Sequence, residues 1–145
     1  MINRLVFFVL TLFIFMGCSA KKKPIEYGKD ACDHCKMLIM DPKFGAEIIT
    51  LKGKIFLFDD IICMINFIEE SDLKQADIAK VYVIDYNNQT DLIDAHTAFY
   101  VKSDLIKSPM AGGLAAFYNQ EQRHNQQQKW QGQEMTWDEV NAINK

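Results

Sequence analysis

The chain is poor in proline and glycine, and it carries no excess of basic residues. Three prolines and seven glycines among 145 residues exclude collagen-like and proline-rich architectures. Sixteen basic residues stand against nineteen acidic ones, and the basic residues form no cluster beyond the lysines at 21–23. Because nucleic-acid-binding proteins usually carry a basic stripe, this balance argues against nucleic acid as a partner.

The sequence also lacks a hydrophobic run long enough for a confident membrane span. The apolar run Leu5–Met16, which one threonine interrupts, is shorter than the roughly 20 residues that a spanning helix needs. Arg4 precedes the run, as in a bacterial secretory signal, and the run ends at Gly17-Cys18, which resembles the end of a lipoprotein signal. We therefore expect residues 1–17 to be a lipoprotein signal peptide and Cys18 to be acylated. A plain signal peptide followed by an ordinary Cys18 is the alternative.

This leader predicts where the protein works. We expect residues 18–26 to form an acylated, flexible tether whose three lysines are a solvated spacer near anionic head groups. The folded domain would then cover residues 27–145 and face the periplasm, anchored by lipid to the cell membrane or the outer membrane. Export would place the remaining thiols in a compartment where disulfides can persist.

Residues that build a core are abundant, since 49% of the chain is hydrophobic and 12% is aromatic. This composition predicts one ordinary folded domain. Residue patterns predict strands at 44–51, 55–58, 81–86, 99–102 and 113–118, and helices at 61–70, 119–130 and 137–143. The order strand-strand-helix therefore occurs twice, at 44–70 and more loosely at 99–130. We predict an α+β fold in which an antiparallel sheet with packed helices forms two strand-strand-helix units of one compact domain.

The segment Cys32–Met37, Cys-Asp-His-Cys-Lys-Met, carries most of the chemistry. A c-type haem site requires a histidine directly after the second cysteine, and Lys36 stands there. A structural zinc site requires about four nitrogen or sulfur ligands, usually as two close pairs, and the sequence shows no second pair. Cys63 lies within the predicted helix 61–70, where a small buried hydrophobe is its expected role.

One remaining interpretation is a thiol–disulfide oxidoreductase that uses Cys32 and Cys35. His34 would stabilise a neighbouring thiolate and raise the reduction potential of the pair. Such motifs open a long helix, however, whereas this one has no clear strand before it and meets Pro42 ten residues after Cys32. This interpretation is therefore the second choice.

The favoured interpretation is a Cu(I) site, because Cu(I) prefers thiolate and thioether ligands. If residues 35–37 are extended, the side chains of Cys35 and Met37 point to the same face, and both sulfurs can meet one ion. Met40 would face the other way and belong to the core. His34 is either an additional ligand or an exposed residue, and the exposed role is slightly favoured.

Several further positions accompany the two cysteines. The pattern reads Cys32-x-x-Cys35-x-Met37-x-Ile39-x-Asp41-x-x-Phe44-Gly45-Ala46-Glu47, then Gly53, Phe58-Asp59-Asp60-Ile61, Cys63, Ser108-Pro109-Met110, Gly112-Gly113-Leu114-Ala115-Ala116-Phe117 and Trp137-Asp138-Glu139-Val140. This pattern resembles the NosL family, the copper-binding accessory lipoproteins of nitrous oxide reductase, over most of residues 27–143. The chain departs from the family at Lys36, where members often carry glycine, and in the glutamine-rich stretch after Phe117.

The resemblance implies a copper-binding protein and not an enzyme. It implies one Cu(I) ion held by Cys35, Met37 and Met110, while Cys32 is a further ligand, a disulfide partner of Cys35 or a redox guard. It also implies an apo copper enzyme and its maturation machinery as partners, with nitrous oxide reductase expected and another copper enzyme or a copper store as alternatives. No serine-histidine-aspartate arrangement, phosphate-binding glycine loop or opposed carboxylate pair points to catalysis.

Overall fold

The structure is a computed structural model and describes residues 21–143. The expected signal peptide and the acylated Cys18 lie outside this range and stay predictions. Within residues 21–143, every helix is too short or too polar to cross a bilayer.

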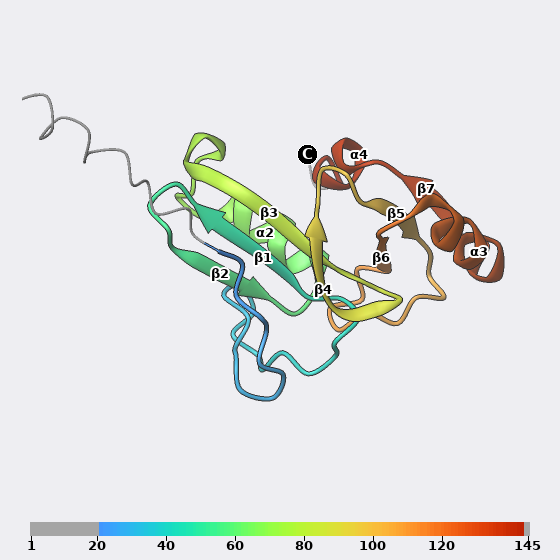
Figure 1. Ribbon diagram of the computed structural model, residues 1–145, viewed down its shortest axis with the longest axis horizontal. Coiled ribbons are helices and arrows are strands. Elements are labelled where there is room, and N and C mark those ends of the chain that lie inside the picture. The colour runs from blue at the N-terminus through green and yellow to red at the C-terminus, as the bar shows by residue number, and fades with distance from the viewer. Residues whose placement is uncertain (1–20, 144–145) are drawn as a thin grey trace, which may run out of the picture.

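A seven-stranded sheet forms the centre of the domain (Figure 1). In chain order the elements are β1 (Ala46–Thr50), β2 (Ile55–Phe58), α2 (Ile61–Glu70), a 3-10 turn (Gln75–Asp77), β3 (Ile78–Asp85), β4 (Asn88–Asp94), β5 (Phe99–Lys102), β6 (Leu114–Phe117), α3 (Gln120–Trp130), β7 (Gln133–Met135) and α4 (Trp137–Asn141). The strands lie in the order β2-β1-β3-β6-β5-β7, with β4 paired to β3. The predicted α+β class and both strand-strand-helix units, β1-β2-α2 and β5-β6-α3, are confirmed.

The sheet differs from the prediction in one parallel pairing and in two additional strands, β4 and β7. Every other strand pair is antiparallel, but β3 and β6 run parallel and meet at Asp85 and Ala116. This contact joins the two units, so the sheet is mixed and not purely antiparallel. Strand β4 was not predicted, because its residues at 88–91 are polar and turn-forming; its backbone nevertheless pairs with β3.

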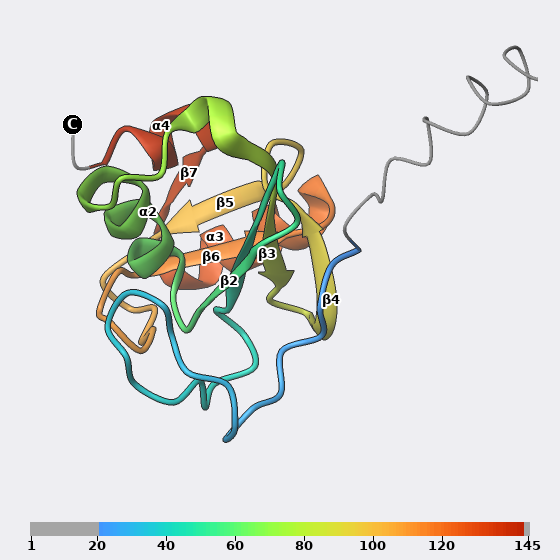
Figure 2. The ribbon, with the colours of Figure 1, turned by 90° about the vertical axis from the view of Figure 1, so that its left-hand side faces the viewer.

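Helix α2 covers the sheet beside β1 and β2 (Figures 1 and 2). It begins where Asp60 accepts a hydrogen bond from the backbone N–H of Ile62, the standard way to satisfy a free amide at a helix start. Its buried face comprises Ile61, Cys63, Met64 and Ile65. The predicted capping box of α4, formed by Thr136 and Glu139, is also present.

Part of the expected tether, residues 22–25, contacts the domain. The Lys22 side chain donates a 2.7 Å hydrogen bond to the Leu92 carbonyl of β4, and the Lys23 backbone N–H donates to Glu47 of β1 at 3.0 Å. Ile25 is buried in the core. The boundary between tether and domain stays a prediction.

Candidate metal centre

The motif Cys32–Met37 forms a tight loop, and neither a helix nor an extended strand. The Cys32 N–H donates to the Met37 carbonyl at 2.8 Å, and the Lys36 N–H donates to the Cys32 carbonyl at 3.0 Å. Lys36 sits in the left-handed region with φ 66°, a conformation that glycine adopts most readily. Residues 35–37 are therefore not extended, so the strand geometry used to pair Cys35 with Met37 is wrong.

Two contacts fix this loop on the domain. Asp33 exchanges a pair of 2.8 Å hydrogen bonds with Leu57 of β2, its N–H donating to the Leu57 carbonyl and its carboxylate accepting from the Leu57 N–H. The His34 ring lies 3.0 Å from the Glu70 carboxylate at the end of α2. His34 thus bridges the loop to the helix and stands outside the thiol cluster described next.

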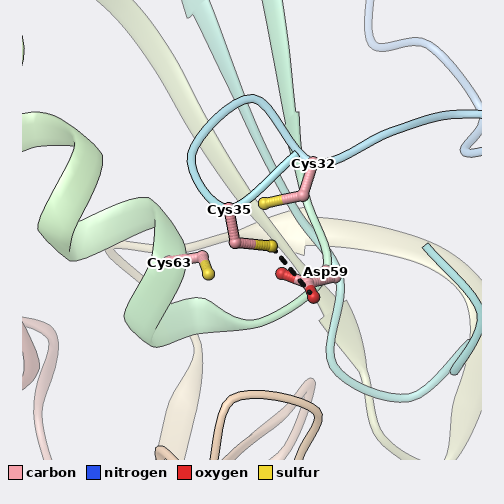
Figure 3. Close-up of side chains that lie close together, drawn as sticks. All are labelled: Cys32, Cys35, Asp59 and Cys63. Atoms are coloured by element: carbon pink, nitrogen blue, oxygen red, sulfur yellow. Dashed lines mark hydrogen bonds between the residues drawn. The ribbon is translucent and has the colours of Figure 1, made fainter. Parts of the chain in front are cut away.

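Four side chains converge beneath the loop (Figure 3). The sulfurs of Cys32, Cys35 and Cys63 and a carboxylate oxygen of Asp59 all lie within 4.8 Å of one another. Cys32 and Cys35 come from the loop, Asp59 follows the last residue of β2, and Cys63 lies in the first turn of α2. Among residues 21–143, this is the one such group of histidine, cysteine and acidic side chains.

The cluster has a closed inner side and a more open outer side. Cys32 is 0% exposed, Cys63 is 1% exposed and Asp59 is 2% exposed, whereas Cys35 is only half-buried. All three cysteines are free thiols. An ion bound here would thus be reached from solvent by way of Cys35.

The protein environment makes the three thiols unequal. The neighbouring Cys63 side chain and the backbone N–H groups of Asp59, Cys35 and His34 lower the pKa of Cys32 to about 6, against the cost of burial. The neighbouring Cys32, together with burial, raises the pKa of Cys63. Burial and the neighbouring Cys32 raise the pKa of Cys35. The surroundings thus favour the thiolate form, which is the form that binds metal, at Cys32 over the other two cysteines.

Asp59 presents a carboxylate to these sulfurs. Its Oδ2 atom accepts a 3.5 Å hydrogen bond from the Cys35 thiol. Its Oδ1 atom is buried and has no hydrogen-bond partner among the described residues. A buried polar atom normally finds a partner. This oxygen is therefore an unused acceptor beside the three sulfurs.

The two methionines expected as ligands lie outside the buried cluster. Met37 is 49% exposed and Met110 is 38% exposed. The Met37 N–H faces the Cys35 sulfur, and the Met110 N–H donates to Asp60 at 3.0 Å. Their backbones are therefore held next to Cys35 and to the start of α2, and both side chains are exposed.

Met40 is 66% exposed, so its expected place in the core is wrong. The left-handed conformation of Lys36 interrupts the alternation of side-chain directions that an extended segment would have. Ile39, and not Met40, is therefore the buried residue.

Sequence reasoning missed two members of the cluster, Asp59 and Cys63. Cys63 is buried as expected, but it faces other sulfurs in addition to apolar neighbours. Folding supplies the second pair of ligands, which the sequence did not show as a motif. Asp59 comes from the end of β2, and Cys63 comes from the start of α2. The available signal was the spacing of four residues between Asp59 and Cys63 across a predicted helix start, which places both side chains near one end of α2.

Comparisons with a family model and with solved structures both give matches. A family model described as NosL matches residues 24–143. The fold is similar to the crystal structure of the copper chaperone NosL from Shewanella denitrificans, with a TM-score of 0.70, 20% sequence identity, and coverage of 83% of this chain and 95% of that chain. The curated proteins yield no match.

Proposed function

Because the chain belongs to the NosL family, we propose that it binds Cu(I) and passes it to a copper enzyme outside the cytoplasm. The protein whose fold it shares is described as a copper chaperone. The expectation of a binding protein, and not an enzyme, agrees with this family. Copper is thus the cargo of the protein.

The single observation that carries the proposal is the group of three free thiols and one carboxylate within 4.8 Å. Thiolates are soft ligands, and soft ligands select Cu(I) among the common biological metals. The sulfurs come from two separate parts of the chain, so the folded domain, and not a flexible peptide, brings them together.

The exposed side of the site suits release of the ion. We place the ion that is ready for transfer on Cys35, Met37 and Met110, the half-buried thiolate and the two exposed thioethers. An acceptor sulfur or imidazole can enter such an open, three-coordinate set before the donor leaves. Transfer by ligand exchange then needs no free copper in solution.

A lipid at Cys18 would hold this site close to a membrane. Lys22, where contacts with the domain begin, is four positions after Cys18, and four residue steps span at most about 14 Å. The domain would thus lie against the periplasmic face of the membrane. The expected acceptor is nitrous oxide reductase, with its maturation machinery; another copper enzyme or a copper store is the alternative.

The oxidoreductase interpretation gains little from the structure. Cys32 has the lowered pKa that an attacking thiol needs, but it is fully buried. The residues after Cys35 form a turn and no helix. Insulin reduction by the purified protein should therefore be negligible, and turnover comparable to that of an oxidoreductase would reverse the ranking.

The test of copper binding is a competition titration of the full-length protein with a Cu(I) chelator under reducing, anaerobic conditions. We expect one Cu(I) per chain and a loss of most affinity in Cys35→Ser. Unchanged affinity in Cys35→Ser, or tighter binding of Zn(II) than of Cu(I), would contradict the proposal. The loaded protein is then mixed with an apo nitrous oxide reductase; failure to activate it would point to another acceptor or to storage.

A further inference from the structure

Two of the three clustered thiols have no place in the ligand set Cys35, Met37 and Met110. Cys32 and Cys63 are fully buried, yet their sulfurs face Cys35 and each other (Figure 3). A buried cysteine is usually a small hydrophobe, and one such residue would need no explanation. Two that meet a third thiol and a carboxylate form a set of donors.

The spacing of the donors already fits an ion. A metal–thiolate bond is about 2.3 Å long, as in zinc sites, so three sulfurs in a plane around one ion lie about 4.0 Å apart. The four donor atoms lie within 4.8 Å of one another. Even with all three sulfur–sulfur distances at that limit, each sulfur moves inward by only about 0.5 Å to close around an ion, without any change of fold.

The surrounding contacts hold the donors in place. The hydrogen bonds between Asp33 and Leu57 fix the loop on β2, and the contact between His34 and Glu70 fixes it on α2, the helix that carries Cys63. Backbone N–H groups of His34, Cys35 and Asp59 face the Cys32 sulfur. These dipoles favour a negative sulfur in a place that water does not reach.

We propose that Cys32, Cys35 and Cys63 form an inner Cu(I) site, and that the ion moves from this site to an outer position at Met37 and Met110 while it stays bound to Cys35. The inner site holds the ion between three thiolates, two of them fully buried, so that solvent reaches it only on the side of Cys35. The outer position exposes it for transfer. Asp59 is a positioning residue that holds the Cys35 thiol by a hydrogen bond. This inference rests on the proposed binding of Cu(I).

Binding at the inner site conserves charge and electrons. Each thiol that coordinates the ion while protonated loses its proton to solvent, and a sulfur–copper bond forms in its place. Copper stays Cu(I) throughout, so no oxidant or reductant takes part. Movement to the outer position replaces the bonds to Cys32 and Cys63 with bonds to the two thioethers, and the two freed sulfurs regain whatever protons they held.

Cys63→Ala in the full-length protein in detergent tests the inner site. We expect Cu(I) affinity to fall at least tenfold, and the ultraviolet thiolate-to-copper absorption per bound ion to decrease, because fewer thiolates coordinate. Cys32→Ala should have the same two effects. The matched control is Met64→Leu, which removes a buried sulfur from the next position of α2 and conserves volume; it should leave both values unchanged.

The outcomes separate this inference from copper binding itself. Wild-type affinity and absorption in Cys63→Ala and Cys32→Ala would overturn the inner site while leaving Cu(I) binding at Cys35 intact. Absence of Cu(I) binding in the wild-type protein would instead defeat the proposed function. Zn(II) bound in preference to Cu(I), with loss in Asp59→Asn, would show a four-coordinate divalent site and overturn the inference. Because Cys63→Ala removes a buried sulfur and leaves a small cavity, Cys63→Ser, which nearly keeps the volume, is measured beside it, with circular dichroism to confirm folding.

Discussion

At the scale of single residues, one type of side chain acquires three different properties from its surroundings. The pKa of Cys32 is lowered by the neighbouring Cys63 side chain and by three backbone N–H groups that face its sulfur. The pKa of Cys63 is raised by the neighbouring Cys32 and by burial. Cys35 is the one thiol of the three with substantial access to solvent. The thiols thus differ in the two properties that govern metal exchange, which are charge and accessibility.

The exposed methionines allow a prediction about transfer. Met37→Leu and Met110→Leu keep volume and apolarity but remove the thioether. We expect each change to weaken Cu(I) binding by no more than a few fold, to leave the thermal midpoint of unfolding unchanged, and to slow transfer to an acceptor at least tenfold. Stopped-flow transfer to a chelator measures the rate. An unchanged transfer rate in the double variant would exclude the thioethers as ligands.

Lys36 permits a prediction about stability. Its φ of 66° costs a residue with a Cβ atom about 1 kcal/mol, and glycine avoids this cost. Lys36→Gly should therefore raise the free energy of unfolding by about 1 kcal/mol, measured by urea denaturation. The control is Lys52→Gly, an exposed turn lysine whose φ is not positive, which should not gain stability. Equal effects at the two positions would contradict the explanation by backbone strain.

At the scale of elements, the junction between β2 and α2 assigns two adjacent carboxylates to different tasks. Asp60 points along the helix, where one oxygen accepts from the Ile62 N–H and the other accepts from the Met110 N–H. Asp59 points back to the thiols. A helix cap therefore explains Asp60 but not Asp59.

The double role of Asp60 predicts a larger loss of stability than an ordinary helix cap gives. Asp60→Ala removes the cap of α2 and the acceptor for Met110, so the free energy of unfolding should fall by about 2 kcal/mol. Thr136→Ala, which removes only the exposed cap of α4, should cost about 1 kcal/mol. Urea titration of both variants gives the comparison. A loss at Asp60 no larger than that at Thr136 would contradict its role in holding Met110.

At the scale of the whole molecule, the sheet contains a buried carboxylate that links stability to pH. Glu47 lies in β1, is 0% exposed and accepts hydrogen bonds from the Lys23 backbone. Burial raises the pKa of Glu47 from 4.5 to about 7, although the Lys23 N–H and nearby lysines oppose the shift. Between these two values the folded state holds a proton that the unfolded state has lost.

Stability should therefore fall as pH rises from 4.5 to about 7. Glu47→Gln removes this titration, and at pH 8 it should raise the free energy of unfolding by roughly 2 kcal/mol. Urea denaturation of both proteins at pH 5 and pH 8 measures the difference. Glu69→Gln, at an exposed position of α2, is the control. The same pH dependence in the wild type and in Glu47→Gln would exclude Glu47 as its source.

The attachment of the whole molecule to a membrane has its own test. Intact mass spectrometry of the membrane fraction should show a mature chain that begins at Cys18 and carries two or three acyl groups. Cys18→Ala should abolish this mass and leave an unprocessed or soluble product. A soluble wild-type chain that begins at any other residue would contradict the lipid anchor.

Local patterns in the sequence were sufficient to predict the secondary structure around the site. The apolar spacing of residues 61–70 and the cap before it predict α2, and the β-branched runs at 44–51 and 55–58 predict the hairpin β1–β2. These features depend on neighbours a few residues apart, which any stretch of sequence displays. The order of all predicted strands and helices along the chain was also enough to predict both strand-strand-helix units, β1-β2-α2 and β5-β6-α3.

Only the tertiary structure decided which side chains meet. Cys63 joins Cys32 and Cys35 because α2 folds back beneath a loop that Asp33 holds on β2, and contacts across about 30 residues leave no local pattern. The parallel contact of β3 with β6, and the docking of Lys23 on Glu47, are long-range in the same way. The motif by itself was enough to predict a sulfur site near residues 32–37. Folding decided which sulfurs lie together there, because the members of a site are set by proximity in space.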